Sequence, residues 1–486
     1  MITPEAPDRA YSTRLRTALL FTGTGTAGAY HAGVLRALHE AGVKIDLAGG
    51  RGIGAASALF AAIDGGARLW EPAGIWKDGS ATGFYGWRRA LRYAGYALLT
   101  AGLVLLLPLA LLAAAVVVGL AGLLLALIGL EAAGATLTAW FTRWVDTLFT
   151  PSALPTVVPR LVLFALLATA AILACALLAS YFREPVRRRS RHGLIWRLIG
   201  APLSSEGLAA RCSTELWNLI RGAAPLAAPA PTELARKYVE LLSENLGQPG
   251  FREVIVAAHD MDARRDVVFA LLGARHRGRF FARPAVDPGT RAVEALDLGG
   301  VARDHALDAL GAALAVPLAT APHLVRFSAE GPWRGEAHRL CDRPEGLSRL
   351  IEEAAAAGAE QVILVAAIPP QGRAHELSAG RADFRGRAGE QLGAFEAAAL
   401  RDALEQFTGR FASLFVIRPS HNALAPLDFG GVYDERSDRR QIVAELVDRG
   451  YEDAYRLFIE PVVGAGAETP RTVRPRNGGQ TDTSQR

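Results

Sequence analysis

Short, largely apolar runs alternate with helical patterns over most of the chain. The runs have the length of buried parallel strands and lie at residues 18–21, 45–48, 254–258, 362–367 and 414–417. Apolar residues recur at helical spacing in residues 32–41, 347–357, 393–407 and 439–460. Strands that alternate with helices predict an α/β fold class, here a three-layer α/β/α domain.

The middle of the chain follows a different pattern. Residues 94–130 carry no formal charge over 37 positions, and residues 161–182 form a second uncharged run of 22. About 20 apolar residues are enough to cross a bilayer, and a helix buried in a soluble domain normally keeps a polar stripe. The pattern therefore predicts a transmembrane helical hairpin inserted into the α/β domain, within residues 88–197.

Arginines flank the two uncharged runs. They stand at positions 88, 89 and 92 before the first run, and at 183, 187, 188, 189, 191 and 197 after the second. Because basic residues remain on the cytoplasmic side, we expect both flanks there and an even number of crossings, most simply two. The first run could instead break near Pro108 and cross twice.

The linker between the runs, residues 131–159, is expected outside or at the membrane interface. Its aromatic residues fit an interfacial helix, with a buried aromatic cluster as the alternative; they are Trp140, Phe141, Trp144 and Phe149. The α/β domain is then split into residues 15–80 and 200–465, both on the cytoplasmic side. The tail, residues 466–486, lacks apolar periodicity and is expected to be disordered.

Composition excludes several functional classes. The hydrophobic content is 51%, and 53 basic against 48 acidic residues leave a net charge of +5, too balanced to indicate nucleic acid. The cysteines are scattered and form no CxxC pair, so no metal site is expected; they are Cys175, Cys212 and Cys341. We also expect no cofactor.

Two glycine-rich turns follow the first two strands. The first contains Gly23, Thr24, Gly25, Thr26, Ala27 and Gly28, and it opens a helix, so its amides could hold a phosphate or an oxyanion. Its G-x-G-x-x-G spacing also allows a dinucleotide site, but Asp46 stands at the start of the second strand rather than at its end. The second turn contains Gly50, Arg51, Gly52, Ile53 and Gly54 between a strand and a helix, which is the arrangement of a nucleophile elbow.

These two turns and the helix AYHAGVLRALHEAG between them resemble the start of the patatin-like phospholipase family over residues 19–60. The resemblance implies a lipid acyl hydrolase domain, membrane lipids as partners and a serine–aspartate dyad. Three departures stand out: the nucleophilic serine falls on Gly52, the arginine of the oxyanion loop on Ala27, and the middle glycine of that loop on Thr24.

The family's aspartate precedes a later strand by about sixteen residues. Counting back from Gly358, which begins the matching G-A-x-x-V-I-x-V sequence, places it at Asp342, where the two glycines that follow it in the family are missing. Asp428 lies in a similar D-F-G-G sequence but is interpreted as a turn residue. Ser57 and the histidines His31, His39 and His259 are interpreted as packing or surface residues. Arg51 could bind an anionic ligand or pair with an acidic neighbour.

The leading hypothesis is a catalytically impaired patatin-like membrane protein that binds or senses lipid. The first alternative is an active acyl hydrolase that uses Asp342 with an altered mechanism, and the second is a nucleotide-binding membrane protein. From the sequence alone, replacing Gly52 by serine should restore modest esterase activity, because the flanking glycines and Asp342 are present.

Overall fold

The computed structural model divides the chain into two units, residues 1–85 with 205–486 and residues 86–204. It describes residues 11–149, 158–183, 200–282, 293–331, 333–370 and 383–464. The predicted tail at 466–486 lies outside the described residues, as do parts of the predicted membrane insertion at 150–157 and 184–199.

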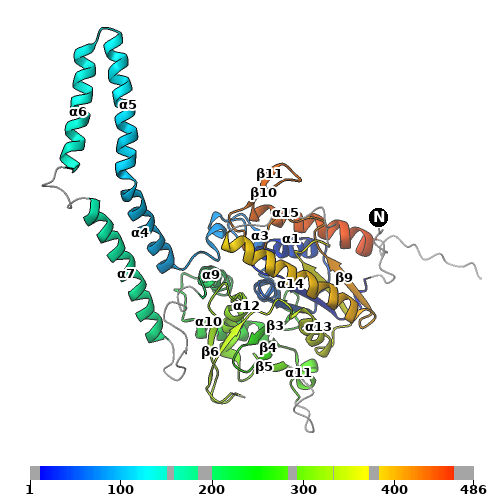
Figure 1. Cartoon of the computed structure of the whole chain (residues 1–486). Helices are drawn as coiled ribbons and strands as arrows, with labels where there is room; N and C mark the ends of the chain where they lie inside the picture. The colour runs from blue at the N-terminus through cyan, green and yellow to red at the C-terminus, as the bar shows by residue number, and fades with distance from the viewer. Residues whose placement is uncertain are drawn as a thin grey trace, which may run out of the picture. The chain divides into compact units, whose positions relative to one another are not determined.

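A central, mostly parallel sheet organises the first unit (Figure 1). Its main strand order is β5-β4-β3-β2-β1-β8-β9, and β3 and β4 are antiparallel neighbours. The strands are β1 (Thr17–Thr22), β2 (Leu47–Arg51), β3 (Glu253–Asp260), β4 (Arg265–Leu271), β5 (Val293–Asp297), β8 (Gln361–Ala366) and β9 (Ser413–Ile417). A hairpin of β6 (His323–Arg326) and β7 (Ala337–Cys341) joins the sheet through β3.

Helices flank both faces of this sheet. Alternate residues of β1 point to opposite sides: Ala18 and Leu20 join the core under α13 (Leu347–Ala356) and α14 (Phe384–Phe407), and Phe21 faces Gly54 of α2 (Gly54–Ala62). Helix α1 (Ala27–Glu40) packs against α2 and α15 (Val443–Ala454). The arrangement is a mixed α/β fold consistent with three layers, as the alternating pattern predicts.

The remaining elements of this unit are shorter or peripheral. They are α3 (Ala67–Trp70), η1 (Gly79–Gly83), α9 (Glu206–Arg221), α10 (Pro231–Asn245), α11 (Ala274–Phe281), η2 (Arg303–His305), α12 (Ala306–Leu314), β10 (Val432–Asp434), β11 (Arg439–Gln441) and the π-helical η4 (Tyr455–Gly464).

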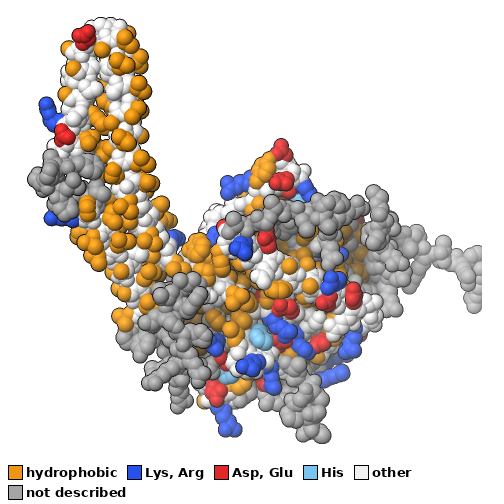
Figure 2. Space-filling view, viewed as in Figure 1, with side chains coloured by type: hydrophobic (Ala, Val, Ile, Leu, Met, Phe, Trp, Pro, Cys, Tyr) orange, Lys and Arg blue, Asp and Glu red, His pale blue; other side chains and the backbone are white. Residues whose placement is uncertain are grey.

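The second unit consists of helices α4 (Arg89–Leu105), α5 (Leu107–Leu127), α6 (Glu131–Phe149) and α7 (Val158–Arg183). Two of its segments, Leu107–Leu127 and Pro159–Ala179, are long and apolar enough to cross a membrane. Hydrophobic side chains cover much of the visible surface of these helices (Figure 2). The first uncharged run is thus two helices that meet at Leu106, next to Pro108, which suits the first turn of a helix.

The helices of this unit form two packed pairs. Residues 131–149, expected as an interfacial linker, form α6, which packs along α5, while α7 packs along α4. Helices α5 and α6 approach closely because two glycines meet: a Cβ on Gly134 would lie 2.6 Å from the carbonyl oxygen of Gly122. Trp140 and Trp144 are exposed, so these two side chains do not belong to a buried cluster. The side chain of Phe149 lies outside the described residues.

The chain enters and leaves the second unit through paired segments. Trp87 forms an antiparallel bridge with Leu203, the amide of Arg88 donates to Pro202 at 2.9 Å, and the amide of Ser204 donates to Gly86 at 3.0 Å. The two connections therefore run side by side.

Candidate functional site

The strand β2, Gly52 and helix α2 form a sharp turn at the carboxyl end of the sheet. Gly52 has φ of +56°, in the left-handed region that glycine adopts without a steric penalty. A Cβ on Gly52 would lie 3.0 Å from Oδ2 of Asp342 and 2.3 Å from the carbonyl oxygen of Gly23. The structure therefore brings together the two positions that the sequence proposes as nucleophile and base, but leaves no room for a side chain at the first.

Asp342 is held by a neighbouring arginine. The Arg51 guanidinium donates from Nε to Asp342 Oδ1 at 3.1 Å and from Nη2 to Asp342 Oδ2 at 2.6 Å. Arg51 also donates to Glu396 Oε1 at 3.1 Å, and Thr24 donates to the same oxygen at 2.6 Å. All three charged side chains are at least 95% buried. Of the two interpretations of Arg51, the structure shows the pairing with acidic neighbours.

Burial acts on the two kinds of charge in this cluster in opposite ways. It works against the charged form of Arg51, but Asp342 and Glu396 outweigh it and raise the pKa of Arg51 above its usual value. Burial raises the pKa of Glu396, and the nearby Arg51 and the hydrogen bond from Thr24 offset only part of that rise. One arginine between two carboxylates thus leaves Glu396 with a tendency to hold a proton.

The glycine-rich loop after β1 uses its backbone amides within the protein. Ile53, which follows the nucleophile position, donates its N–H to the Gly23 carbonyl at 2.9 Å, and Thr26 donates to the Pro426 carbonyl at 2.9 Å. A Cβ on Gly25 would lie 1.9 Å from the oxygen of Pro426, so this carbonyl packs directly on the loop. In hydrolases with an elbow, the amide after the nucleophile helps bind the oxyanion. In this chain, the Ile53 amide already donates its hydrogen bond to the Gly23 carbonyl.

The Ser57 hydroxyl is no accessible replacement for the missing nucleophile. Ser57 lies 3.3 Å from Nδ1 of His31, whose Nε2 donates to the Thr22 carbonyl at 3.1 Å, and both side chains are buried. Burial lowers the pKa of His31 to about 3, so the ring is neutral. Ser57 and His31 therefore pack in the core. Asp428 accepts a hydrogen bond from the amide of Ala425 at 2.8 Å, as expected of a turn residue.

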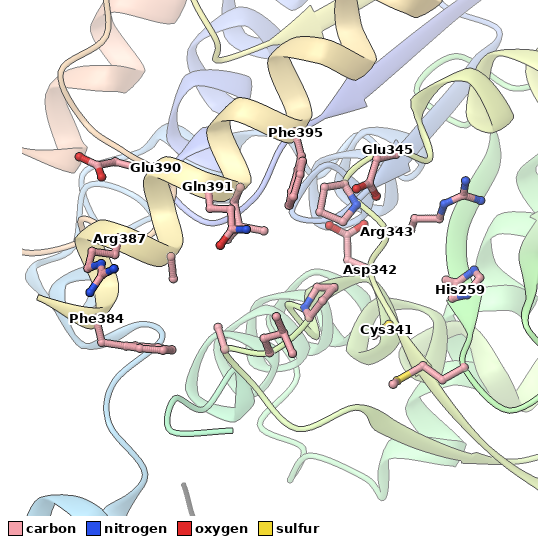
Figure 3. Close-up of a pocket in the computed structure, with 17 residues that line it drawn as sticks. His259, Cys341, Asp342, Arg343, Glu345, Phe384, Arg387, Glu390, Gln391 and Phe395 are labelled. Carbon is pink, nitrogen blue, oxygen red and sulfur yellow. The ribbon is translucent and has the colours of Figure 1, made fainter. Parts of the chain in front are cut away.

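A large pocket opens beside Asp342 (Figure 3). Its volume is about 1290 Å³, and its walls come from the end of β7, the turn after α12 and the first half of α14. Apolar lining residues are Met261, Pro317, Leu318, Phe384, Leu392 and Phe395. Asp342 is the member of the buried cluster that reaches this pocket, while Gly52 is not part of its lining.

The polar residues of the pocket include His259 and Cys341. His259, interpreted from the sequence as a packing or surface residue, lines the pocket, and its Nδ1 lies 2.7 Å from Oδ1 of Asp266. Burial raises the pKa of Cys341 to about 12, so its thiol is protonated at neutral pH. Sequence reasoning missed Glu396 and this pocket. The spacing of Phe384 and Phe395 on one face of α14 was the available signal for the latter.

The fold and site define an α/β protein with an elbow-like turn, a buried arginine–carboxylate cluster and an adjoining apolar pocket. No protein-family model and no curated protein matches the chain. Among solved structures, the crystal structure of VipD from Legionella pneumophila is similar at a TM-score of 0.29 and 13% identity, over 94% of this chain and 71% of that one. At that score the likeness carries no argument, and the site is understood from this chain's own residues.

Proposed function

We propose that this chain is a patatin-like membrane protein whose hydrolase site is catalytically silent and whose pocket binds the acyl part of a membrane lipid. The observation that carries the proposal is the pairing of Arg51 with Asp342 beside Gly52. The nucleophile is absent, and the carboxylate that would serve as base is bound in both of its oxygens.

Acyl transfer by a serine–aspartate dyad needs a nucleophile, a free base and amides that stabilise the oxyanion. Without a nucleophile, such sites keep only about 10³ to 10⁴ of rate over the uncatalysed reaction. In this chain Arg51 also engages the base and Gly23 engages the amide of Ile53. These contacts favour a binding role over the alternative of an active hydrolase that uses Asp342.

The pocket supports lipid as the ligand class. Its lining combines apolar residues with polar and charged residues from both β7 and α14, which suits an amphiphile with an acyl chain. The same chain carries two helices that are apolar enough to cross a membrane, so the protein would lie in contact with membrane lipids. We place the α/β domain on the cytoplasmic side, in line with the arginine-rich flanks of the insertion.

The test combines activity and bound lipid in the full chain, purified in detergent. A fluorophosphonate probe should leave the protein unlabelled, and mass spectrometry of the native protein should detect co-purified lipid. Replacing Ala388, a pocket-lining residue of α14, by tryptophan should reduce that lipid several-fold because the indole ring would obstruct part of the pocket. The matched control is Ala394→Trp, at an exposed alanine of the same helix outside the lining.

Two results would contradict the proposal. Stoichiometric labelling by the probe would show an active nucleophile and favour the hydrolase. Equal lipid content in the parent, Ala388→Trp and Ala394→Trp proteins would show that lipid does not occupy this pocket.

A further inference from the structure

Four large apolar side chains of the pocket lining are also exposed to solvent. They are Leu318, Phe395, Met261 and Phe384, with exposed fractions of 83%, 43%, 42% and 39%. They come from three separate parts of the chain: the turn after α12, helix α14 and the turn between β3 and β4. We call these four residues the apolar rim. Large apolar side chains gathered at a pocket mouth mark a surface that binds a partner.

Leu318 is the most exposed member and has an unusual backbone conformation. Its φ of +63° lies in the left-handed region, which a bulky residue rarely adopts and which glycine or asparagine adopts more easily. The turn therefore holds a leucine outward at a position where a polar residue would be easier to accommodate in water. An apolar environment outside the protein would explain both the residue type and its exposure.

The rim lies next to the point where the chain leaves the α/β unit. Tyr85 is the last residue of this unit before the helical insertion. Its hydroxyl donates to the carbonyl of Leu314 at 2.8 Å, just before the turn that carries Leu318. Its own carbonyl accepts a hydrogen bond from Arg385 at 3.1 Å, beside Phe384. Tyr85 thus contacts two of the segments that form the rim.

The chain is short between this point and the uncharged part of the insertion. The last charged residue is Arg92, and Tyr93 begins the uncharged stretch, eight positions after Tyr85. Four extended residues and one turn of α4 span at most about 20 Å. Helix α4 packs along α7, which contains a segment apolar enough to cross a membrane. A bilayer that holds this segment is therefore tethered to Tyr85 by a short length of chain.

We propose that the apolar rim inserts into the surface of the bilayer, so that the pocket opens directly onto lipid acyl chains. This inference rests on the proposed membrane placement and lipid-binding function. The charged lining residues around the rim are two arginines and two exposed glutamates, Arg343, Arg387, Glu345 and Glu390. Because these charges balance, apolar insertion rather than attraction to anionic lipid drives the contact, and the docking is insensitive to salt.

The experiment measures lipid contact in the full chain, reconstituted in phosphatidylcholine nanodiscs. An environment-sensitive fluorophore is attached to Leu318→Cys in a Cys175→Ser background, where the other two cysteines are buried. Brominated acyl chains in the nanodisc should quench this label by about half or more, because bromine quenches only fluorophores inside the bilayer. The quenching should be the same in low and high salt, because the contact is apolar. The matched control is Asp402→Cys, which lies on the same face of α14 as Phe384 but five turns, about 27 Å, farther along.

Quenching at position 318 and not at position 402 supports docking through the rim. An unquenched label at 318 overturns the inference, and equal quenching at both positions overturns it as well, because the whole face of α14 would then lie on the membrane. Co-purified lipid is measured on the same variants in detergent, before they are reconstituted in nanodiscs. If lipid stays in the pocket while the label at 318 is unquenched, the rim inference fails and the proposed function stands; if lipid is absent, the proposed function fails.

Discussion

The turn at position 52 leaves no space for a side chain. The carbonyl of Gly23 would lie 2.3 Å from any Cβ at this position, and the amide of Ile53 holds that carbonyl in place. The flanking glycines and Asp342 are present, as the sequence indicates. However, there is no space for a side chain at position 52, and Asp342 is not free to act as a base because it pairs with Arg51. The expectation that serine would restore activity therefore changes.

We predict that the Gly52→Ser protein does not hydrolyse short-chain esters above the parent. A serine at φ +56° adopts a strained left-handed conformation, at a cost on the order of 1 to 3 kcal/mol, and the Gly23 loop must also move to relieve the contact with its Cβ. Asp342 also remains bound by Arg51 and cannot act as a base. Hydrolysis of p-nitrophenyl butyrate and the thermal unfolding midpoint are measured together. A folded Gly52→Ser protein with clear turnover would contradict this account.

Glu396 makes a pH-dependent contribution that can be isolated. Because its pKa is raised in the folded protein, the folded state keeps a proton at pH values where the unfolded chain has released it. The stability from this group is fully present below about pH 4, near the usual pKa of glutamate, and is lost as pH rises through the folded-state pKa.

We therefore predict that Glu396→Gln gains stability relative to the parent as pH increases from about 5 to about 8. Glutamine keeps an oxygen that can accept from Thr24 and Arg51 but cannot lose a proton. Thermal unfolding midpoints across this pH range provide the measurement, with the exposed Glu405→Gln on the same helix as control. A difference between Glu396→Gln and parent that stays constant with pH would show that Glu396 does not titrate there.

Some of these residues could be found from the sequence and others could not. Local spacing places Gly52 at the turn, and counting back from a strand places Asp342 beside it. Glu396 is 345 positions from Arg51, and nothing in the pattern of α14 marks it as the partner of a distant arginine. The Pro426 carbonyl is equally hidden, because a backbone contact between distant loops leaves no residue type as a signal.

At the scale of elements, the sequence pattern predicted β1, β2, β3, β8 and β9, but it missed β4, although six of the seven residues of that strand are buried. Every residue of β1 and β8 is buried, which is the pattern that sequence reasoning detects best. Strands β6 and β7 alternate exposed and buried residues around histidines and arginines, and they were missed. Residues 131–149 were interpreted as an interfacial helix because of their aromatic residues, and nothing in their threonines and charges indicated that α6 packs along α5.

The threonines of α6 satisfy their hydroxyls within the helix. Thr138 and Thr142 donate to the carbonyls of Gly134 and Thr138, four residues earlier, at 3.0 and 2.9 Å. A hydroxyl bonded in this way costs little next to an apolar neighbour. A segment of mixed composition can therefore pack along α5, a property that mean hydropathy does not report.

The side of the membrane on which the connection between α5 and α6 lies can be predicted. If residues 94–130 cross once, the connection at Gly129 lies outside, whereas two crossings would return it to the cytoplasm. We predict that a membrane-impermeant maleimide labels Gly129→Cys in intact cells, because basic flanks such as those of the insertion favour the cytoplasmic side. Both variants carry Cys175→Ser, and Ser80→Cys, exposed in the α/β unit, should label only after permeabilisation. Protection of position 129 would rule out the single crossing.

At the scale of the whole molecule, one sheet is assembled from two stretches of chain that the insertion separates. Strand β2 ends at Arg51 and pairs with β3, which begins at Glu253, and β1 pairs with β8 at Gln361. The paired segments around Trp87 and Leu203 bring the two stretches back side by side. Continuity of the sheet is thus preserved across a helical unit that makes up residues 86–204.

This split means that neighbouring strands of the sheet are synthesised at different times. Ribosomes add about 5 to 20 residues per second, so β1 and β2 wait on the order of 10 to 40 seconds for β3 to emerge, and longer for β8. During that interval β1 and β2 can pair with each other, but their outer edges lack β8 and β3, and unpaired strand edges are prone to aggregate. The hydrophobic helices emerge inside this window, and their capture by the membrane would keep each unfinished chain apart from the others until the second half of the sheet arrives.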